Sequence, residues 1–187
     1  MSAFDPVRSF RKLAYNNALA NVRLHRACAA SQPGEFEAKR VSFFPSIKGT
    51  LNHILTVDWF YVDALEGGTL GQKAFDIEEP YDRLNELTGQ QADVDRRLVA
   101  FCEGLTPETA VRIIDIQRTG RIQRERTDDV LNHLFQHQTH HRGQVHAMLA
   151  GTSVAPPQLD EFIVADDARF RGEELAALSW DETKLMR

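Results

Sequence analysis

Histidines gather in one short stretch of this chain. Of its seven histidines, five fall within the fourteen residues from 133 to 146, and these are His133, His137, His140, His141 and His146. On a helix, side chains four residues apart lie one turn apart on the same face. His137 and His141 have this spacing, so their imidazoles can hold one metal ion from one side. A third ligand must then come from elsewhere in the chain, and His53 is the best candidate.

The rotation of the expected helix directs this pair of histidines toward the core. At about 100° per residue, one face collects the apolar side chains, which are Val130, Leu134, Val145 and Met148. His137 and His141 point into the middle of that face, His133 and His140 lie at its edge, and His146 points away. Burying two imidazoles side by side without a partner is costly, and a shared metal ion removes that cost. The alternative is a pair of ordinary buried histidines bonded to backbone or water.

His53 meets the requirement for a ligand on a facing helix. It shares a helical face with Val57, Phe60 and Ala64, so it also points inward. In a helix bundle, metal sites are built from side chains on facing helices. Three neutral nitrogen donors suit a divalent ion, with zinc or nickel favoured and iron as the alternative, and they leave coordination positions open. An open position is typical of a catalytic site, whereas a filled fourth position indicates a structural one.

Two other metal motifs are excluded. A zincin needs His-Glu-x-x-His, but residues 137–141 read His-Gln-Thr-His-His and offer no glutamate as general base. A ferritin-like di-iron centre needs inward glutamates and Glu-x-x-His pairs, and no acidic residue occurs between Asp129 and Asp160.

Four helices are expected to position these residues, at about 6–30, 45–66, 81–104 and 128–150. Ser46 and Thr127 are the expected N-caps of the second and fourth helices. Short β-branched runs on either side of a Thr-Gly turn predict a β-hairpin within residues 110–126. Residues 152–187 form a tail that contains one short helix. The pattern predicts an all-α protein, a four-helix bundle in a single domain over residues 1–187.

Composition narrows the class of protein further. A chain of 187 residues is long enough for one buried core. The net charge is −5 and no dense run of Lys and Arg occurs, which disfavours nucleic acid as a partner. No apolar stretch approaches the ~20 residues of a membrane-spanning helix, and residues 1–6 lack the pattern of a signal peptide. The two cysteines, Cys28 and Cys102, make no disulfide framework, so we expect a cytoplasmic protein with reduced thiols.

Four segments resemble motifs of one family. Residues 137–144, His-Gln-Thr-His-His-Arg-Gly-Gln, resemble its signature of a His, two spacers and His-His-Arg-Gly-Gln. Residues 49–55 resemble its Thr-Leu-x-His-Leu segment, and residues 17–24 its Asn-x-x-Ala-Asn-x-x-Leu segment, although Leu19 stands where the family often has Trp. Residues 156–160 resemble a segment after the last long helix. This is the DinB-like (YfiT-like) family, which is unrelated to the DNA polymerase of the same name.

The resemblance spans residues ~8 to ~165 and carries several implications. It implies an up-down-down-up four-helix bundle that holds a divalent metal through His53, His137 and His141. It also implies a homodimer. Relatives with known chemistry use low-molecular-weight thiols, such as bacillithiol or mycothiol, in transfer or isomerisation reactions.

The leading functional hypothesis is a metal-dependent transferase of the thiol S-transferase type, acting on a small molecule. No catalytic residue is assigned, and the candidates are His140, Gln144 and Tyr61. The alternatives are a non-catalytic metal-binding or stress-responsive bundle with a structural ion, and a small-molecule binding module.

The homodimer has a second ground in the sequence. Leu55 and Phe135 are expected on the outer faces of two long helices, where exposed apolar residues tend to mark partner surfaces. Arg142 is expected to point away from the core, as a surface or dimer-contact residue.

Overall fold

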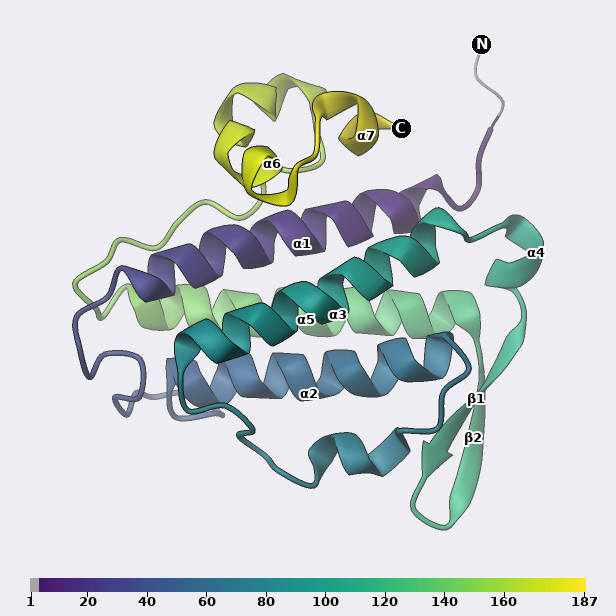
Figure 1. The fold of residues 1–187 in the computed structure, drawn as a ribbon, viewed down its shortest axis with the longest axis horizontal. Coiled ribbons are helices and arrows are strands. Elements are labelled where there is room, and N and C mark those ends of the chain that lie inside the picture. Colours follow the sequence, from purple (N-terminus) through teal and green to yellow (C-terminus); the bar gives the residue numbers. More distant parts are fainter. Residues whose placement is uncertain (1–3) are drawn as a thin grey trace.

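Four long helices form the body of the protein (Figure 1). The structure is a computed structural model that describes residues 4–187. The long helices are α1 (Arg8–Ala29), α2 (Ile47–Leu65), α3 (Leu84–Glu103) and α5 (Thr127–Leu149). Helix α1 packs against α3, and α2 packs against both α5 and α3. One apolar cluster from all four helices fills the space between them. The predicted all-α bundle is therefore confirmed.

Short elements connect and extend the bundle. The hairpin of β1 (Ile113–Arg118) and β2 (Arg121–Arg126) is antiparallel and pairs Ile116 with Gln123. Gly120 has a φ of 71° in its turn, a conformation that glycine adopts without strain. The predicted hairpin before the last long helix is confirmed. The remaining elements are η1 (Gly71–Phe75), α4 (Pro107–Ala110), η2 (Ala165–Phe170), α6 (Gly172–Leu178) and α7 (Glu182–Met186).

The helix starts differ in detail from those expected. Ser46 caps α2 as predicted, because its hydroxyl accepts from the Gly49 N–H at 2.9 Å. Helix α3 starts at Leu84 rather than at about residue 81. The prediction that Thr127 caps α5 was wrong. Thr127 is the first helical residue, and its hydroxyl donates to the Arg112 carbonyl at 3.0 Å, which ties the hairpin to the helix.

The C-terminal segment lies along α1, where Figure 1 shows α6 and α7. Arg171 anchors it: the guanidinium is fully buried, pairs with Glu182 at 2.7 Å and donates to the Val164 carbonyl at 2.8 Å. From α1, the buried Lys12 ammonium donates to the Leu185 carbonyl at 3.0 Å. These contacts make the segment a second layer over α1 rather than a loose tail.

The expectation that Leu55 and Phe135 lie on outer faces was wrong. Leu55 is fully buried and Phe135 is 6% exposed. A pattern with one apolar face and one polar face underestimates the burial of these two residues, because both helices are covered on more than one side. Helix α2, for example, contacts α3, α5, η1 and β1. The homodimer stays a prediction that rests on the family resemblance alone.

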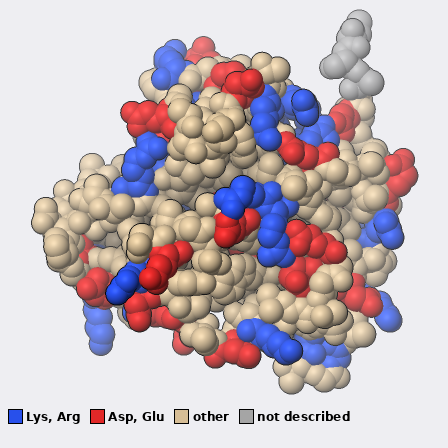
Figure 2. Space-filling view, viewed as in Figure 1, with Lys and Arg blue, Asp and Glu red and all other residues tan. Residues whose placement is uncertain are grey.

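Charges of both signs are interspersed on the face of the molecule in Figure 2. Ion pairs between elements also bring opposite charges together, as Arg97 of α3 does with Glu66 at the end of α2, at 2.6 Å. This face therefore lacks a field of a single sign. Among the described residues, none of the helices combines the length and the hydropathy needed to cross a bilayer.

Candidate metal centre

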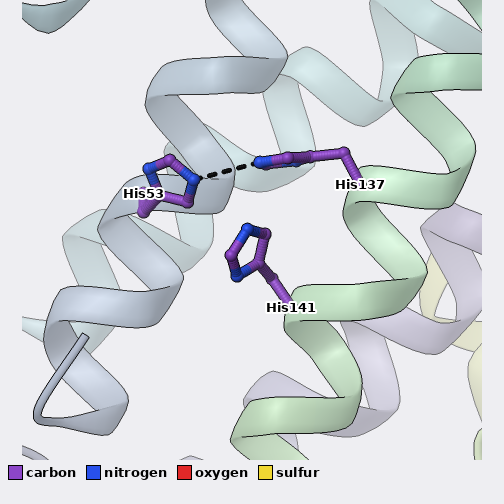
Figure 3. Close-up of side chains that lie close together, drawn as sticks. All are labelled: His53, His137 and His141. Atoms are coloured by element: carbon purple, nitrogen blue, oxygen red, sulfur yellow. Dashed lines mark hydrogen bonds between the residues drawn. The ribbon is translucent and has the colours of Figure 1, made fainter. Parts of the chain in front are cut away.

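Three imidazole rings from α2 and α5 converge on one point (Figure 3). The ligand nitrogens of His53, His137 and His141 all lie within 4.8 Å of one another. The Nε2 atoms of His53 and His137 are 3.0 Å apart. Two nitrogens that share an ion at the usual zinc–nitrogen distance lie roughly 2.9–3.4 Å apart. The structure thus brings together the three histidines singled out in the sequence, at a separation that fits a shared ion.

The triad is partly exposed, and among residues 4–187 its group contains no fourth His, Cys, Asp or Glu. His141 is 8% exposed, and His53 and His137 are half-buried. An ion held here keeps coordination positions for water or a small molecule.

Burial keeps the three imidazoles neutral. It lowers the pKa of His53 to about 4 and that of His137 to about 3, and the neighbouring imidazoles act in the same direction. Burial also lowers the pKa of His141, against the opposing effect of its hydrogen bond to Gln144. All three therefore carry a free lone pair at pH 7, which is the form that binds metal ions.

Phe44 packs against the triad from the loop before α2. Its ring stacks on His53, with centroids 4.2 Å apart, and meets His141 edge-on at 5.7 Å. Phe44 therefore restrains the orientation of two of the three rings. No pattern in the sequence indicates this role, because Phe44 lies in an irregular stretch without helical or strand periodicity.

The other candidate residues fall around the triad rather than in it. Tyr61 packs edge-on against His133, with ring centroids 5.2 Å apart. Both line an open pocket of about 270 Å³ between α2, α5 and the hairpin. The His133 ring is 6.4 Å from that of His137, so this pocket neighbours the triad. His140 is exposed and accepts a hydrogen bond from Gln144 at 3.2 Å.

The prediction that Arg142 lies on the surface was wrong. It is 5% exposed and donates to the side-chain oxygens of Asn17 and Asn21 on α1. The expected apolar face of α5 was drawn too narrow, because α1 covers a second side of this helix. Gln138, one turn earlier, is fully buried on the same side.

A buried polar network surrounds Arg142 and connects the four long helices. On α3, Asp95 accepts from Asn17 at 2.9 Å and from Asn21 at 3.0 Å. On α2, Asp58 accepts from Gln138 at 2.9 Å. Gln91 of α3 donates to both carboxylates, to Asp58 at 2.8 Å and to Asp95 at 3.1 Å. The hydrogen bond between Gln138 and Asp58 links α5 to α2 about one turn from the triad, so it fixes how α5 is rotated toward His53.

Burial dominates the electrostatics of the network. It raises the pKa of Asp58 to about 7 and that of Asp95 to about 6, while the Arg142 guanidinium opposes both shifts. Burial likewise lowers the pKa of Arg142 to about 10, so this group stays charged at pH 7. The Arg142 cation therefore favours the ionised forms of Asp58 and Asp95, which burial disfavours.

Sequence reasoning missed this network, although a signal for it was present. Asn17 and Asn21 are four residues apart, and so are Gln138 and Arg142. Polar pairs at this spacing, in helices expected to be buried, predict a shared buried face. The two pairs lie more than a hundred residues apart in the sequence, and the structure shows that they contact each other.

Comparisons with known proteins agree with this fold. A model of the DinB family matches residues 4–174. "Protein DinB" of Bacillus subtilis (strain 168) is 25% identical over 153 residues, which cover 78% of this chain and 88% of that protein. The crystal structure of a DinB-like protein from Bacillus cereus ATCC 10987 superposes with a TM-score of 0.54 at 17% identity, covering 77% of this chain and 91% of the other. The crystal structure of a DinB-like protein from Bacillus subtilis superposes with a TM-score of 0.54 at 20% identity, and the match covers 79% of this chain and 92% of the other.

Proposed function

Because the chain belongs to the DinB family, we propose that it binds a divalent metal ion through His53, His137 and His141 and acts as a metal-dependent enzyme on a small molecule. Thiol S-transferase chemistry is the first candidate. The observation that carries the proposal is the set of three neutral imidazoles with no fourth side-chain ligand in their group. Nitrogen donors of this kind suit zinc or nickel first, and iron second. A divalent ion bound there would lower the pKa of a coordinated thiol.

The thiol in such a reaction must come from outside the protein. Cys28 and Cys102 are both buried, and burial raises the pKa of each to about 12. Neither is therefore a thiolate at pH 7, and neither belongs to the histidine group. A low-molecular-weight thiol supplies the nucleophile instead. The open pocket beside Tyr61 and His133 has room for a small co-substrate.

The competing function is a non-catalytic bundle with a structural ion. A structural site closes its coordination shell with four protein ligands, which these three histidines do not. The bundle also has a continuous apolar core that does not depend on the triad. Both features favour the enzyme.

Elemental analysis of the purified protein is the first test. We expect about one divalent ion per chain, because one three-histidine site is present. Turnover is then measured with a panel of low-molecular-weight thiols and electrophiles, before chelation, after chelation and after the metal is restored. The proposal expects turnover to disappear and return with the metal. Protein that carries and takes up no ion would overturn it, and a bound ion whose removal unfolds the chain would support the structural alternative.

A further inference from the structure

Gln144 is hydrogen-bonded to two histidines of α5 on either side of its amide group. Its Oε1 atom is 2.7 Å from Nδ1 of His141, and its Nε2 atom is 3.2 Å from Nε2 of His140. The other ring nitrogen of His141 points toward the gap between His53 and His137 (Figure 3). Gln144 therefore contacts the side of His141 that faces away from the candidate metal centre.

These two contacts determine where the protons are. An amide oxygen can only accept, so Nδ1 of His141 must carry the proton. In a neutral imidazole the other nitrogen then holds a lone pair, and this is the Nε2 atom that faces the gap. An amide nitrogen can only donate, so Nε2 of His140 accepts.

We propose that Gln144 is a positioning residue that holds His141 in the tautomer required for metal binding. The inference rests on the proposed metal-binding function and deepens it. Gln144 and His140 were considered above as candidates for contacting a substrate, and this role acts through His141 instead. Outer hydrogen bonds of this kind commonly fix the ring and tautomer of a metal-binding histidine.

The triad is not uniform in this respect. Nδ1 of His137 is buried without a hydrogen-bond partner. His137 instead faces His53, with 3.0 Å between their Nε2 atoms, and only one of these two atoms can carry a proton in that contact. The proton of that pair is therefore free to lie on either ring. The tautomer of His141, in contrast, is determined by its hydrogen bond to Gln144 before any metal binds.

The first test reads the tautomer in metal-free protein. Imidazole ¹⁵N chemical shifts should show His141 with its proton on Nδ1 in the wild type. Gln144→Leu removes the acceptor and should shift His141 to a mixture of tautomers, whereas Gln144→Glu keeps an acceptor and should restore the wild-type signal. Gln136→Leu, the same exchange at an exposed position of α5, is the matched control and should leave the signal unchanged. A leucine variant at 144 that keeps the wild-type tautomer overturns the inference.

The second test measures affinity for cobalt(II) as the probe. Loss of an outer partner costs about 10–100-fold in metal affinity, so Gln144→Leu should bind cobalt(II) that much more weakly, and Gln144→Glu should recover most of the affinity. Should Gln144→Leu not fold, Gln144→Met removes the same acceptor and replaces it in both tests.

The outcomes separate this inference from the proposed function. If the wild type binds no divalent ion, the proposed function fails, and the tautomer measurement still decides what Gln144 does to His141. If the wild type binds cobalt(II) and Gln144→Leu binds it equally well, the proposed function stands and the role of Gln144 is overturned.

Discussion

Replacing His137 with alanine should abolish tight metal binding and leave the helices in place. His137 supplies one of three ligand atoms that all lie within 4.8 Å of one another, and two imidazoles alone do not make a three-ligand site. We expect a loss of affinity greater than the roughly 10–100-fold that an outer-shell partner contributes. Isothermal titration with zinc or nickel gives the affinity, and circular dichroism gives the helical content.

The fold should tolerate this exchange because His137 contributes little to the stability of the metal-free protein. Its Nδ1 atom is buried without a partner, and burial lowers its pKa to about 3, so the ring occupies an unfavourable environment. The free energy of unfolding should change by only about 1 kcal/mol. His146→Ala, on the same helix but outside the triad, is the matched control and should bind metal as the wild type does. Collapse of the fold in the His137 variant, or in chelated wild type, would instead identify the ion as structural.

Replacing Arg142 with methionine should destabilise the protein strongly at pH 8. The exchange keeps a long side chain but removes the only cation of the buried network, leaving Asp58 and Asp95 without a counter-charge. Arg142 donates to Asn17 and Asn21, which in turn donate to Asp95, so the guanidinium reaches this carboxylate through the asparagines rather than by direct pairing. The loss should therefore approach but not exceed the about 3–5 kcal/mol that breaking a direct buried ion pair costs. For a chain of this size that lowers the melting temperature by on the order of 10 °C. Denaturant unfolding and a melting curve measure the loss.

The loss should shrink as the pH falls. A carboxyl group whose pKa is raised by folding stabilises the fold below its unfolded pKa of 3.8, and this contribution is lost as the pH rises through the folded value, about 6 for Asp95 and about 7 for Asp58. Without the guanidinium both pKa values rise further, so the variant loses more stability over a wider pH range. Its deficit relative to the wild type should therefore be small at pH 5 and large at pH 8.

Arg96→Met is the control for this pH dependence. Arg96 pairs with Asp93 on the surface, and its side chain is 65% exposed. Loss of such a pair changes stability by less than about 1 kcal/mol, without a trend between pH 5 and pH 8. If Arg142→Met behaved like Arg96→Met, the network would not be the electrostatic unit that its hydrogen bonds indicate.

Local rules were enough to predict the main elements and the placement of His137 and His141 on one helical face. The i, i+4 spacing of His137 and His141 survives any small error in the helix ends, because it depends only on the helix being formed. Ser46 and Gly120 act through their own backbone and nearest neighbours, so their roles are also visible in the sequence.

Features that depend on packing between distant segments were not predictable in this way. A helical wheel places Arg142 on the solvent side of α5, because it contains no information about a second helix that covers that side. Its burial follows from contacts with Asn17 and Asn21, more than a hundred residues earlier. Phe44 meets His53 and His141 only because the loop before α2 folds back over the triad.

Helix α5 carries two rows of functional polar side chains, and the second row is offset from the first by one residue. His137 and His141 face α2, whereas Gln138 and Arg142 lie in the network shared with α1, α2 and α3. A protein engineer who transplanted only the histidines onto another bundle would therefore lose the partners that set the rotation of their helix. A successful graft has to carry the second row together with Asp58, the Asn17–Asn21 pair, and Gln91 and Asp95 of α3. The transferable unit is thus a cross-section through all four helices rather than a sequence motif.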